Sequence, residues 1–302
     1  MMAVEVEALA AQYSDSRFLN VLLVNKPHGL RTALQSVLQG FFNKQIEWVE
    51  SQRLDPDSTP VANAFSRFPR FVDQLVALWD AAAHAPRLLC SNDSFDSTSD
   101  GFLTSPVGRG IHLVGERLFA WLQNVCQPLR QEKAVLARLE NLHFFVTSME
   151  GRGGQALRKL FTWAESTLQE TLDAVVSNLM HDHFSHLVKF VDDIDELLLS
   201  YDTDQVKFSL SRLQLAKVMQ LLSADAIATG LSNALRSVAE MSATPQTSTL
   251  IISRLQRSLI KTYVRYANHV KNCYGDVVQP SAEQVNKQLE ATIEEFGPLK
   301  RS

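Results

Sequence analysis

Residues 157–179 read LRKLFTWAESTLQETLDAVVSNL, and apolar side chains recur along this stretch at steps of three or four positions. Such steps return to the same side of an α-helix, so these side chains share one stripe. The members of the stripe are Leu157, Phe161, Ala164, Leu168, Leu172, Val175 and Leu179. The stretch therefore predicts an amphipathic helix whose stripe faces a core.

Two further stripes have the same spacing. The second consists of Phe184, Leu187, Val191, Ile194 and Leu198, and the third of Ile252, Leu255, Leu259, Tyr263, Tyr266, Val270 and Cys273. The first two stripes predict separate helices over about 155–180 and 183–200. The sequence has no sustained alternation of apolar and polar residues bounded by turn signals, which a half-buried strand would need. We therefore expect an all-α protein, and long helices with short connections favour a scaffold or interaction surface.

Proline and glycine residues indicate where the predicted helices are divided. We expect an opening helix over residues 1–25, a first helical bundle over 26–150 and a C-terminal helical bundle over 151–302. The boundary between the bundles falls at the tight connection Gly151-Arg152-Gly153-Gly154. The polar stretch 86–106 is expected to be a mobile surface loop, because it has few apolar side chains to bury.

Local signals predict where individual helices begin and end. Pro69 suits the first position of a helix, where its missing N–H costs nothing. Pro128 is expected to interrupt or bend the helical stretch 108–149. Ser281, followed three residues later by Gln284, has the form of a capping box that opens a last short helix.

Composition excludes several classes of protein. With 45% hydrophobic and 21% charged residues the chain is typical of a globular protein, and wholesale disorder is excluded. A formal net charge of −4 argues against broad adaptation to nucleic acid. Cys90, Cys126 and Cys273 are far apart and odd in number, which favours reduced thiols in a soluble intracellular protein. No apolar run is long enough for a membrane span, and the N-terminus is acidic where a signal peptide is basic.

A cluster of acidic residues, Asp192-Asp193-Ile194-Asp195-Glu196, resembles the aspartate-rich motif of class I isoprenoid synthases. In such enzymes carboxylates on one helical face hold Mg²⁺ ions that bridge a diphosphate, so Asp192, Asp193 and Glu196 are the residues this remote alternative would use. The second metal-binding motif is missing downstream. Because Ile194 belongs to the apolar stripe, the acidic residues are better interpreted as the solvated face of a helix.

Three histidines, His181, His183 and His186, form the second candidate cluster. Zinc ligands on a helix usually come as i, i+4 pairs, and these histidines have neither that spacing nor a nearby cysteine. They are better explained as interfacial or helix-terminal residues. We therefore expect no metal, no cofactor and no catalytic residue, so the protein is not expected to be an enzyme.

A basic stripe remains, made of Arg254, Arg257, Lys261 and Arg265. Their spacing places all four cations on one side of a helix whose other side is apolar. The stripe is a candidate binding surface for acidic lipid headgroups or for an acidic partner helix. The alternative is an ordinary solvated helix face. RNA binding is disfavoured because no exposed aromatic residues are interleaved with the cations.

Several short segments follow one another in a fixed order along the sequence. They are FFNKQIE at 41–47, FSRFPRF at 65–71, LENLHFF at 139–145, HFSHLVKFVDDID at 183–195, the residues Phe208, Leu213, Leu215, Lys217 and Val218, and YANHVKNCY at 266–274. In order and spacing these segments resemble the C-terminal region of an exocyst subunit, the Sec-three or exocyst component one family, whose patterns include an F-P-x-F step and an E-N-F/Y-H stretch. The resemblance extends from about residue 34 to 290.

The resemblance implies an elongated rod of stacked antiparallel helix bundles, of the tethering-complex type. It implies a non-enzymatic subunit that helps to tether secretory vesicles to the plasma membrane before SNARE-mediated fusion. The expected partners are other exocyst subunits, and the expected location is the cytoplasm, with peripheral contact at plasma-membrane sites of secretion. A subunit of another multisubunit tethering complex, or a generic helical scaffold, is the alternative.

Full members of that family also carry an N-terminal PH-like domain and a coiled coil. The PH-like domain binds phosphoinositides and Rho-type GTPases, and neither segment is recognisable here. We therefore expect the chain to start near the rod, and we carry neither binding activity over to it.

Overall fold

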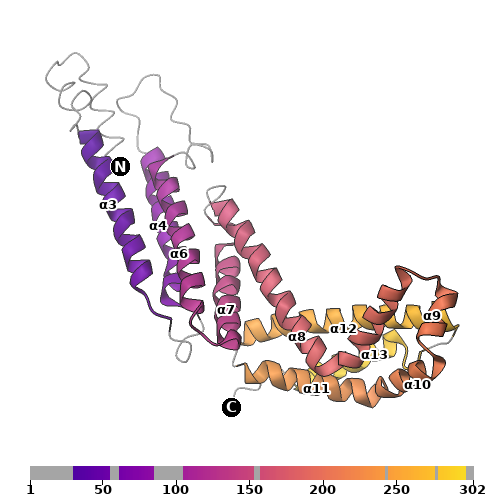
Figure 1. The fold of residues 1–302 in the computed structure, drawn as a ribbon. Coiled ribbons are helices and arrows are strands. Elements are labelled where there is room, and N and C mark those ends of the chain that lie inside the picture. Colours follow the sequence, from indigo (N-terminus) through magenta and orange to yellow (C-terminus); the bar gives the residue numbers. More distant parts are fainter. Residues whose placement is uncertain are drawn as a thin grey trace. The chain divides into compact units, whose positions relative to one another are not determined.

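The computed structural model describes residues 30–54, 61–84, 105–152, 157–241, 244–275 and 278–296. All regular secondary structure within these residues is helical, so the expectation of an all-α protein is confirmed (Figure 1). The predicted opening helix over residues 1–25 lies outside the described residues, and so does the predicted loop over 86–106 up to residue 104. Contacts divide the chain into a first unit, Met1–Leu168, and a second unit, Gln169–Ser302.

The first unit is built around four helices that pack along one another (Figure 1). They are α3 (Leu30–Ser51), α4 (Asn63–His84), α6 (Pro106–Cys126) and α7 (Gln131–Met149). Helix α6 begins after Ser105, whose side chain accepts a hydrogen bond from the Gly108 N–H at 3.0 Å. The break between α6 and α7 contains Pro128, as the sequence predicts.

Aromatic side chains from α4, α6 and α7 form the core of the first unit. The Phe145 ring stacks on Phe68, with centroids 5.9 Å apart, and lies edge-on to Phe119 at 4.8 Å. Phe65 packs edge-on against both Phe119 and Phe145. All four rings are almost fully buried. Edge-to-face pairs add to the free energy gained by burying the rings, so these contacts fix how the three helices pack together.

The start of α4 is set by a buried asparagine rather than by proline. Asn141 of α7 is fully buried, and its Oδ1 accepts the Ala62 N–H at 2.8 Å. This bond satisfies a backbone donor just before α4 begins at Asn63. The prediction that Pro69 opens the helix was wrong, because Pro69 lies inside α4. Burial of Phe65, one turn before Pro69, outweighs the hydrogen bond that the proline removes.

Helix α3 approaches α6 at a glycine. A Cβ atom added to Gly110 would lie far inside the van der Waals contact distance of the Phe42 ring, which is 2% exposed. Gly40 of α3, in contrast, has no atom within 4 Å of its added Cβ.

We expect Gly110→Ala to destabilise the chain by about 1–3 kcal/mol, because the methyl group forces Phe42 out of its pocket. The matched change Gly40→Ala should instead stabilise it by about 0.5–1 kcal/mol, because alanine loses less backbone entropy in a helix. Urea denaturation of both variants measures the two free energies. Equal effects of the two substitutions would contradict the close packing at Gly110.

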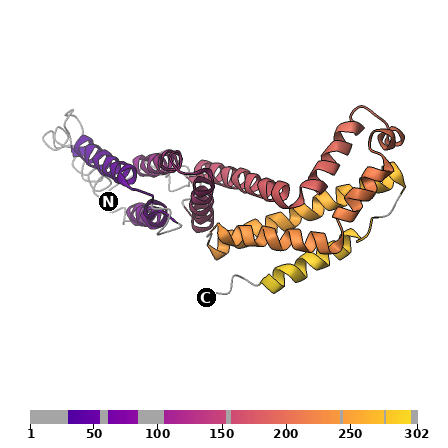
Figure 2. The same ribbon diagram turned by 60° about the horizontal axis from the view of Figure 1, so that its bottom comes forward.

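The second unit contains α8 from Gln169 onward and all the helices that follow it. Helices α11, α12 and α13 lie alongside one another in it (Figure 2). The helices are α8 (Arg158–Leu198), α9 (Thr203–Ser209), α10 (Arg212–Leu221), α11 (Ala224–Glu240), α12 (Pro245–Tyr274) and α13 (Ala282–Phe296). The capping box predicted before α13 is confirmed, since the Ser281 N–H donates to Gln284 Oε1 at 2.8 Å and the Gln284 N–H donates to Ser281 Oγ at 3.3 Å.

The two helices predicted over about 155–180 and 183–200 are the two segments of α8, which meet at a kink at Phe184. Phe184 has non-helical backbone angles, and its ring is buried against Gly230 of α11. A Cβ on Gly230 would lie 2.9 Å from that ring and 3.1 Å from the His183 carbonyl oxygen. The small residue on α11 therefore makes room for the bend in α8.

The predicted apolar stripes are the buried faces of α8 and α12. Every member of the first stripe is buried except Phe161, which is half-buried. On α12, Leu255, Leu259, Tyr263 and Tyr266 are fully buried. The third stripe begins one position earlier than predicted, because Ile251 is the buried residue and Ile252 is half-buried.

The boundary between the two helical bundles that the sequence predicts at residue 151 stays a prediction. It concerns whether the residues after this point fold separately from those before it. We propose that residues 151–302, which retain the whole of α8, fold without the preceding helices. Expressed alone, this fragment should give a helical circular dichroism spectrum and a single cooperative thermal transition. A spectrum of an unfolded chain would show that the C-terminal bundle depends on the preceding residues.

Candidate functional site

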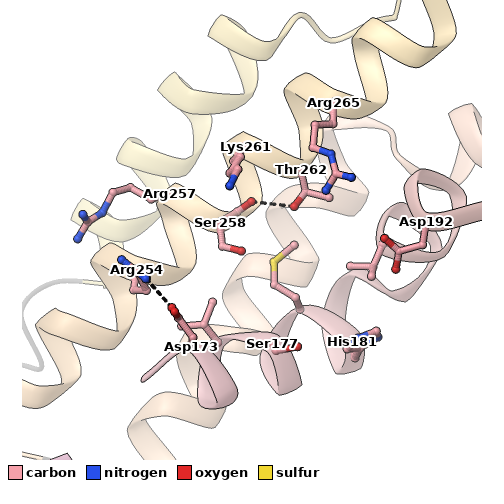
Figure 3. Close-up of a pocket in the computed structure, with 13 residues that line it drawn as sticks. Asp173, Ser177, His181, Asp192, Arg254, Arg257, Ser258, Lys261, Thr262 and Arg265 are labelled. Atoms are coloured by element: carbon pink, nitrogen blue, oxygen red, sulfur yellow. Dashed lines mark hydrogen bonds and ion pairs between the residues drawn. The ribbon is translucent and has the colours of Figure 1, made fainter. Parts of the chain in front are cut away.

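A groove within the second unit lies between α8 and α12 and has a volume of about 470 Å³. All four residues of the predicted basic stripe line it, so the structure places them together on one wall (Figure 3). Residues from α8 form the opposite wall. The basic stripe of the sequence is therefore one edge of a concave surface between two helices.

Helix α12 presents these cations because its ends are well defined and another face is buried. Its first turn is capped by Thr244, whose hydroxyl accepts the Thr247 N–H at 3.3 Å, and Pro245 occupies the first helical position. Its last turn ends at Gly275, which adopts the left-handed conformation at φ 75°. The thirty residues between these caps keep the stripe in register along the groove.

Tyrosine side chains anchor the buried face of α12. The Tyr263 hydroxyl donates to the Pro280 carbonyl at 2.6 Å, and the Tyr274 hydroxyl donates to the Leu210 carbonyl at 2.7 Å. The Tyr266 ring packs edge-on against Phe190 of α8, with centroids 5.5 Å apart. These contacts join α12 to both α8 and the connections that flank α10 and α13.

Two of the four basic residues are held by acidic residues of α8. Arg254 pairs with Asp173, with its Nη2 atom 2.6 Å and its Nε atom 2.8 Å from the same carboxylate oxygen. Arg265 pairs with Asp195, whose other oxygen lies 2.8 Å from His269 Nε2. Both pairs are partly exposed, so each adds little to stability but fixes the position of its side chains.

The other two basic residues have no acidic partner among the described residues. Arg257 is exposed, and its Nε donates only to the Ser253 carbonyl of its own helix at 3.2 Å. Lys261 is also exposed and lies between Arg257 and Arg265 along the helix (Figure 3). Their charges remain available to a ligand.

The α8 side of the groove differs in chemistry from the α12 side. Ser177, His181 and Asp192 are exposed there, and Asp192 lies beyond the kink of α8 (Figure 3). Val176 and Met180 are buried and supply the groove with an apolar floor. The groove therefore combines a basic wall, a wall with an acidic residue and an apolar floor.

The acidic cluster is split between different environments. Asp195 pairs with Arg265 and lies beside His269, Asp192 lines the groove, and Ile194 is fully buried. Within the described ranges, no three histidine, cysteine, aspartate or glutamate residues come close enough to hold a metal ion. Nothing in the arrangement of Asp192, Asp193 and Glu196 favours the isoprenoid-synthase alternative.

The three histidines do not form one site. His183 lies 3.1 Å from the Ser237 hydroxyl of α11, at the kink of α8. His181 faces the groove, and His186 is exposed. The sequence did not identify the partners of the basic stripe, because Asp173 and Asp195 are 81 and 70 residues away from the arginines they pair with.

The described helices include none that is both long enough and apolar enough to cross a membrane. In the part of the chain that the structure describes, helical bundles are thus combined with a mixed-charge groove between α8 and α12. The sequence of residues 123–276 matches the family model described as exocyst complex component Sec3, C-terminal. The match covers half of the chain, so the chain belongs to this family.

A curated relative supports the assignment. An "Exocyst complex component 1" from Dictyostelium discoideum is 23% identical over 277 residues, which is 90% of this chain and 30% of that protein. The chain thus spans less than a third of the length of that relative. No solved structure gives a significant match.

The motifs that suggested the family now have structural roles. The LENLHFF segment supplies the buried Asn141 and Phe145, and the FSRFPRF segment supplies Phe65 and Phe68 to the same core. The closing YANHVKNCY segment supplies buried residues of α12. Phe208, in contrast, is 86% exposed.

Burial of the α12 tyrosines predicts a dependence of stability on alkaline pH. Burial raises the pKa of Tyr263 to about 12, from an ordinary value of 10, and it also raises the pKa of Tyr266. Between pH 10 and about pH 12 the unfolded chain loses the Tyr263 phenolic proton, which the folded chain keeps. The free energy of unfolding should therefore fall as the pH rises through this range, by about 2 kcal/mol for Tyr263 alone.

Urea denaturation at a series of alkaline pH values measures this slope. Tyr263→Phe should reduce the slope and also lower the stability by about 1 kcal/mol at neutral pH, because the hydrogen bond to Pro280 is lost. Tyr201→Phe is the matched control, since Tyr201 is exposed, and it should leave the slope unchanged. Identical slopes for the wild-type chain and Tyr263→Phe would refute this explanation.

Proposed function

We propose that this chain acts as a non-enzymatic subunit of the exocyst and helps to tether secretory vesicles to the plasma membrane before SNARE-mediated fusion. The observation that carries the proposal is the family match over residues 123–276, which runs from the end of α6 through α12. The name of the Dictyostelium relative points to the same complex.

The helical bundles fit a role in holding other proteins together. Helical bundles of this kind offer long surfaces whose outer residues are free to contact partners. The proposed partners are other exocyst subunits, and the proposed location is the cytoplasm, with peripheral contact at secretory sites of the plasma membrane. The proposal assigns neither phosphoinositide binding nor Rho-type GTPase binding to these residues.

Affinity purification of the tagged chain from its own cells, followed by mass spectrometry, tests the proposal. We expect several other exocyst subunits to be recovered with it. Recovery of the subunits of a different tethering complex would overturn the assignment to the exocyst, and recovery of no tethering subunits would overturn the proposal as a whole.

Two variants of α12 test whether the other exocyst subunits are recovered only when the second unit is correctly folded. Leu259→Asp places a charge on the fully buried face of α12 and should abolish recovery of the subunits. Thr249→Asp adds the same charge at an exposed position of the same helix and should leave recovery unchanged. Equal recovery with both variants would show that the second unit does not hold the partners.

A further inference from the structure

The groove between α8 and α12 has three kinds of surface within one cavity of about 470 Å³. One wall carries the exposed cations Arg257 and Lys261, the opposite wall carries Asp192, and the floor contains Val176 and Met180. A ligand that uses the basic wall and the apolar floor needs negative charge on one side and an apolar group next to it, and its negative charge must lie away from Asp192.

We propose that this groove binds a short segment of a partner protein in which acidic residues flank an apolar side chain. The apolar side chain would occupy the floor, and the carboxylates would pair with Arg257 and Lys261. The inference deepens the proposed scaffold role and rests on it, because it names the kind of partner segment that one surface of the scaffold accepts.

The wall that receives the acidic residues is already ordered. Arg254 and Arg265 are held by Asp173 and Asp195, so they keep their side chains along the groove without a ligand. Arg257 and Lys261 lie between them on the same helix face. A segment that binds here therefore orders only two long side chains, which reduces the entropic cost of binding.

The same features disfavour a phosphorylated lipid headgroup. A phosphate group carries more negative charge than a carboxylate, and Asp192 across the groove would repel it. A headgroup also has no apolar part that would occupy the floor at Val176 and Met180. The volume suits a few side chains rather than a whole helix, so an extended segment is the expected form.

The test uses the purified full chain and fluorescein-labelled synthetic peptides, with binding followed by fluorescence anisotropy. The probe peptide alternates glutamate and leucine. In one control peptide lysine replaces glutamate, and in a second serine replaces leucine. We expect the chain to bind the glutamate–leucine peptide and to bind each control at least about tenfold more weakly.

A double variant in the basic wall and a matched double variant outside the groove test where the peptide binds. Arg257→Glu combined with Lys261→Glu should weaken binding of the glutamate–leucine peptide about tenfold or more, because two attractive pairs become repulsive. Lys217→Glu combined with Arg236→Glu changes the net charge equally at exposed positions that do not line the groove, and it should have no effect.

Two single variants test whether the groove must be open for the peptide to bind and whether the negative charge on its α8 wall opposes binding. Ser177→Trp fills the groove from an exposed position without changing any charge, and it should abolish binding. Asp192→Asn removes the repulsive carboxylate and should strengthen binding severalfold. Circular dichroism confirms that each variant retains its helices.

Three results would overturn the proposal: equal binding of the glutamate–serine peptide, unchanged binding by the Arg257→Glu, Lys261→Glu variant, or binding only to vesicles that contain an acidic phospholipid. The peptide assay needs no other exocyst subunit. Its failure, with subunits still recovered from cells, would reject the groove and leave the proposed function intact. Peptide binding without recovered subunits would reject the proposed function alone.

Discussion

Burial of one face of α12 is the constraint on which the second unit depends. Leu255, Leu259, Tyr263 and Tyr266 are fully inaccessible to solvent, and burying each large side chain contributes on the order of 1.5–3 kcal/mol. Because a helix is rigid, fixing this face also fixes the direction of every other side chain on α12. The basic wall of the groove is therefore a consequence of the core behind it.

Much of this arrangement could be predicted from periodicity alone. The steps of three and four along residues 157–179 correctly gave a helix and its buried stripe, because hydrophobic spacing reports directly on which face is removed from water. The break at Pro128 and the capping box at Ser281 were also predicted correctly. Both depend only on neighbouring residues, which a sequence displays.

Features that depend on distant residues could not be predicted. The kink at Phe184 requires a small residue at Gly230, and the start of α4 requires Asn141 on another helix. Likewise, the sequence showed the stripe of cations, but it did not show which of them form ion pairs with acidic residues. That division is made by Asp173 and Asp195, whose approach to α12 follows from the packing of α8.

Each unit also carries one described cysteine with a buried thiol, Cys126 in the first and Cys273 in the second. Burial raises the pKa of both thiols, against the opposing effects of Arg138 beside Cys126 and of Lys207 near Cys273. Since only the thiolate is a strong nucleophile, both cysteines are protected from alkylation while their own unit stays closed. The two positions thus act as chemical reporters, one for the opening of each unit.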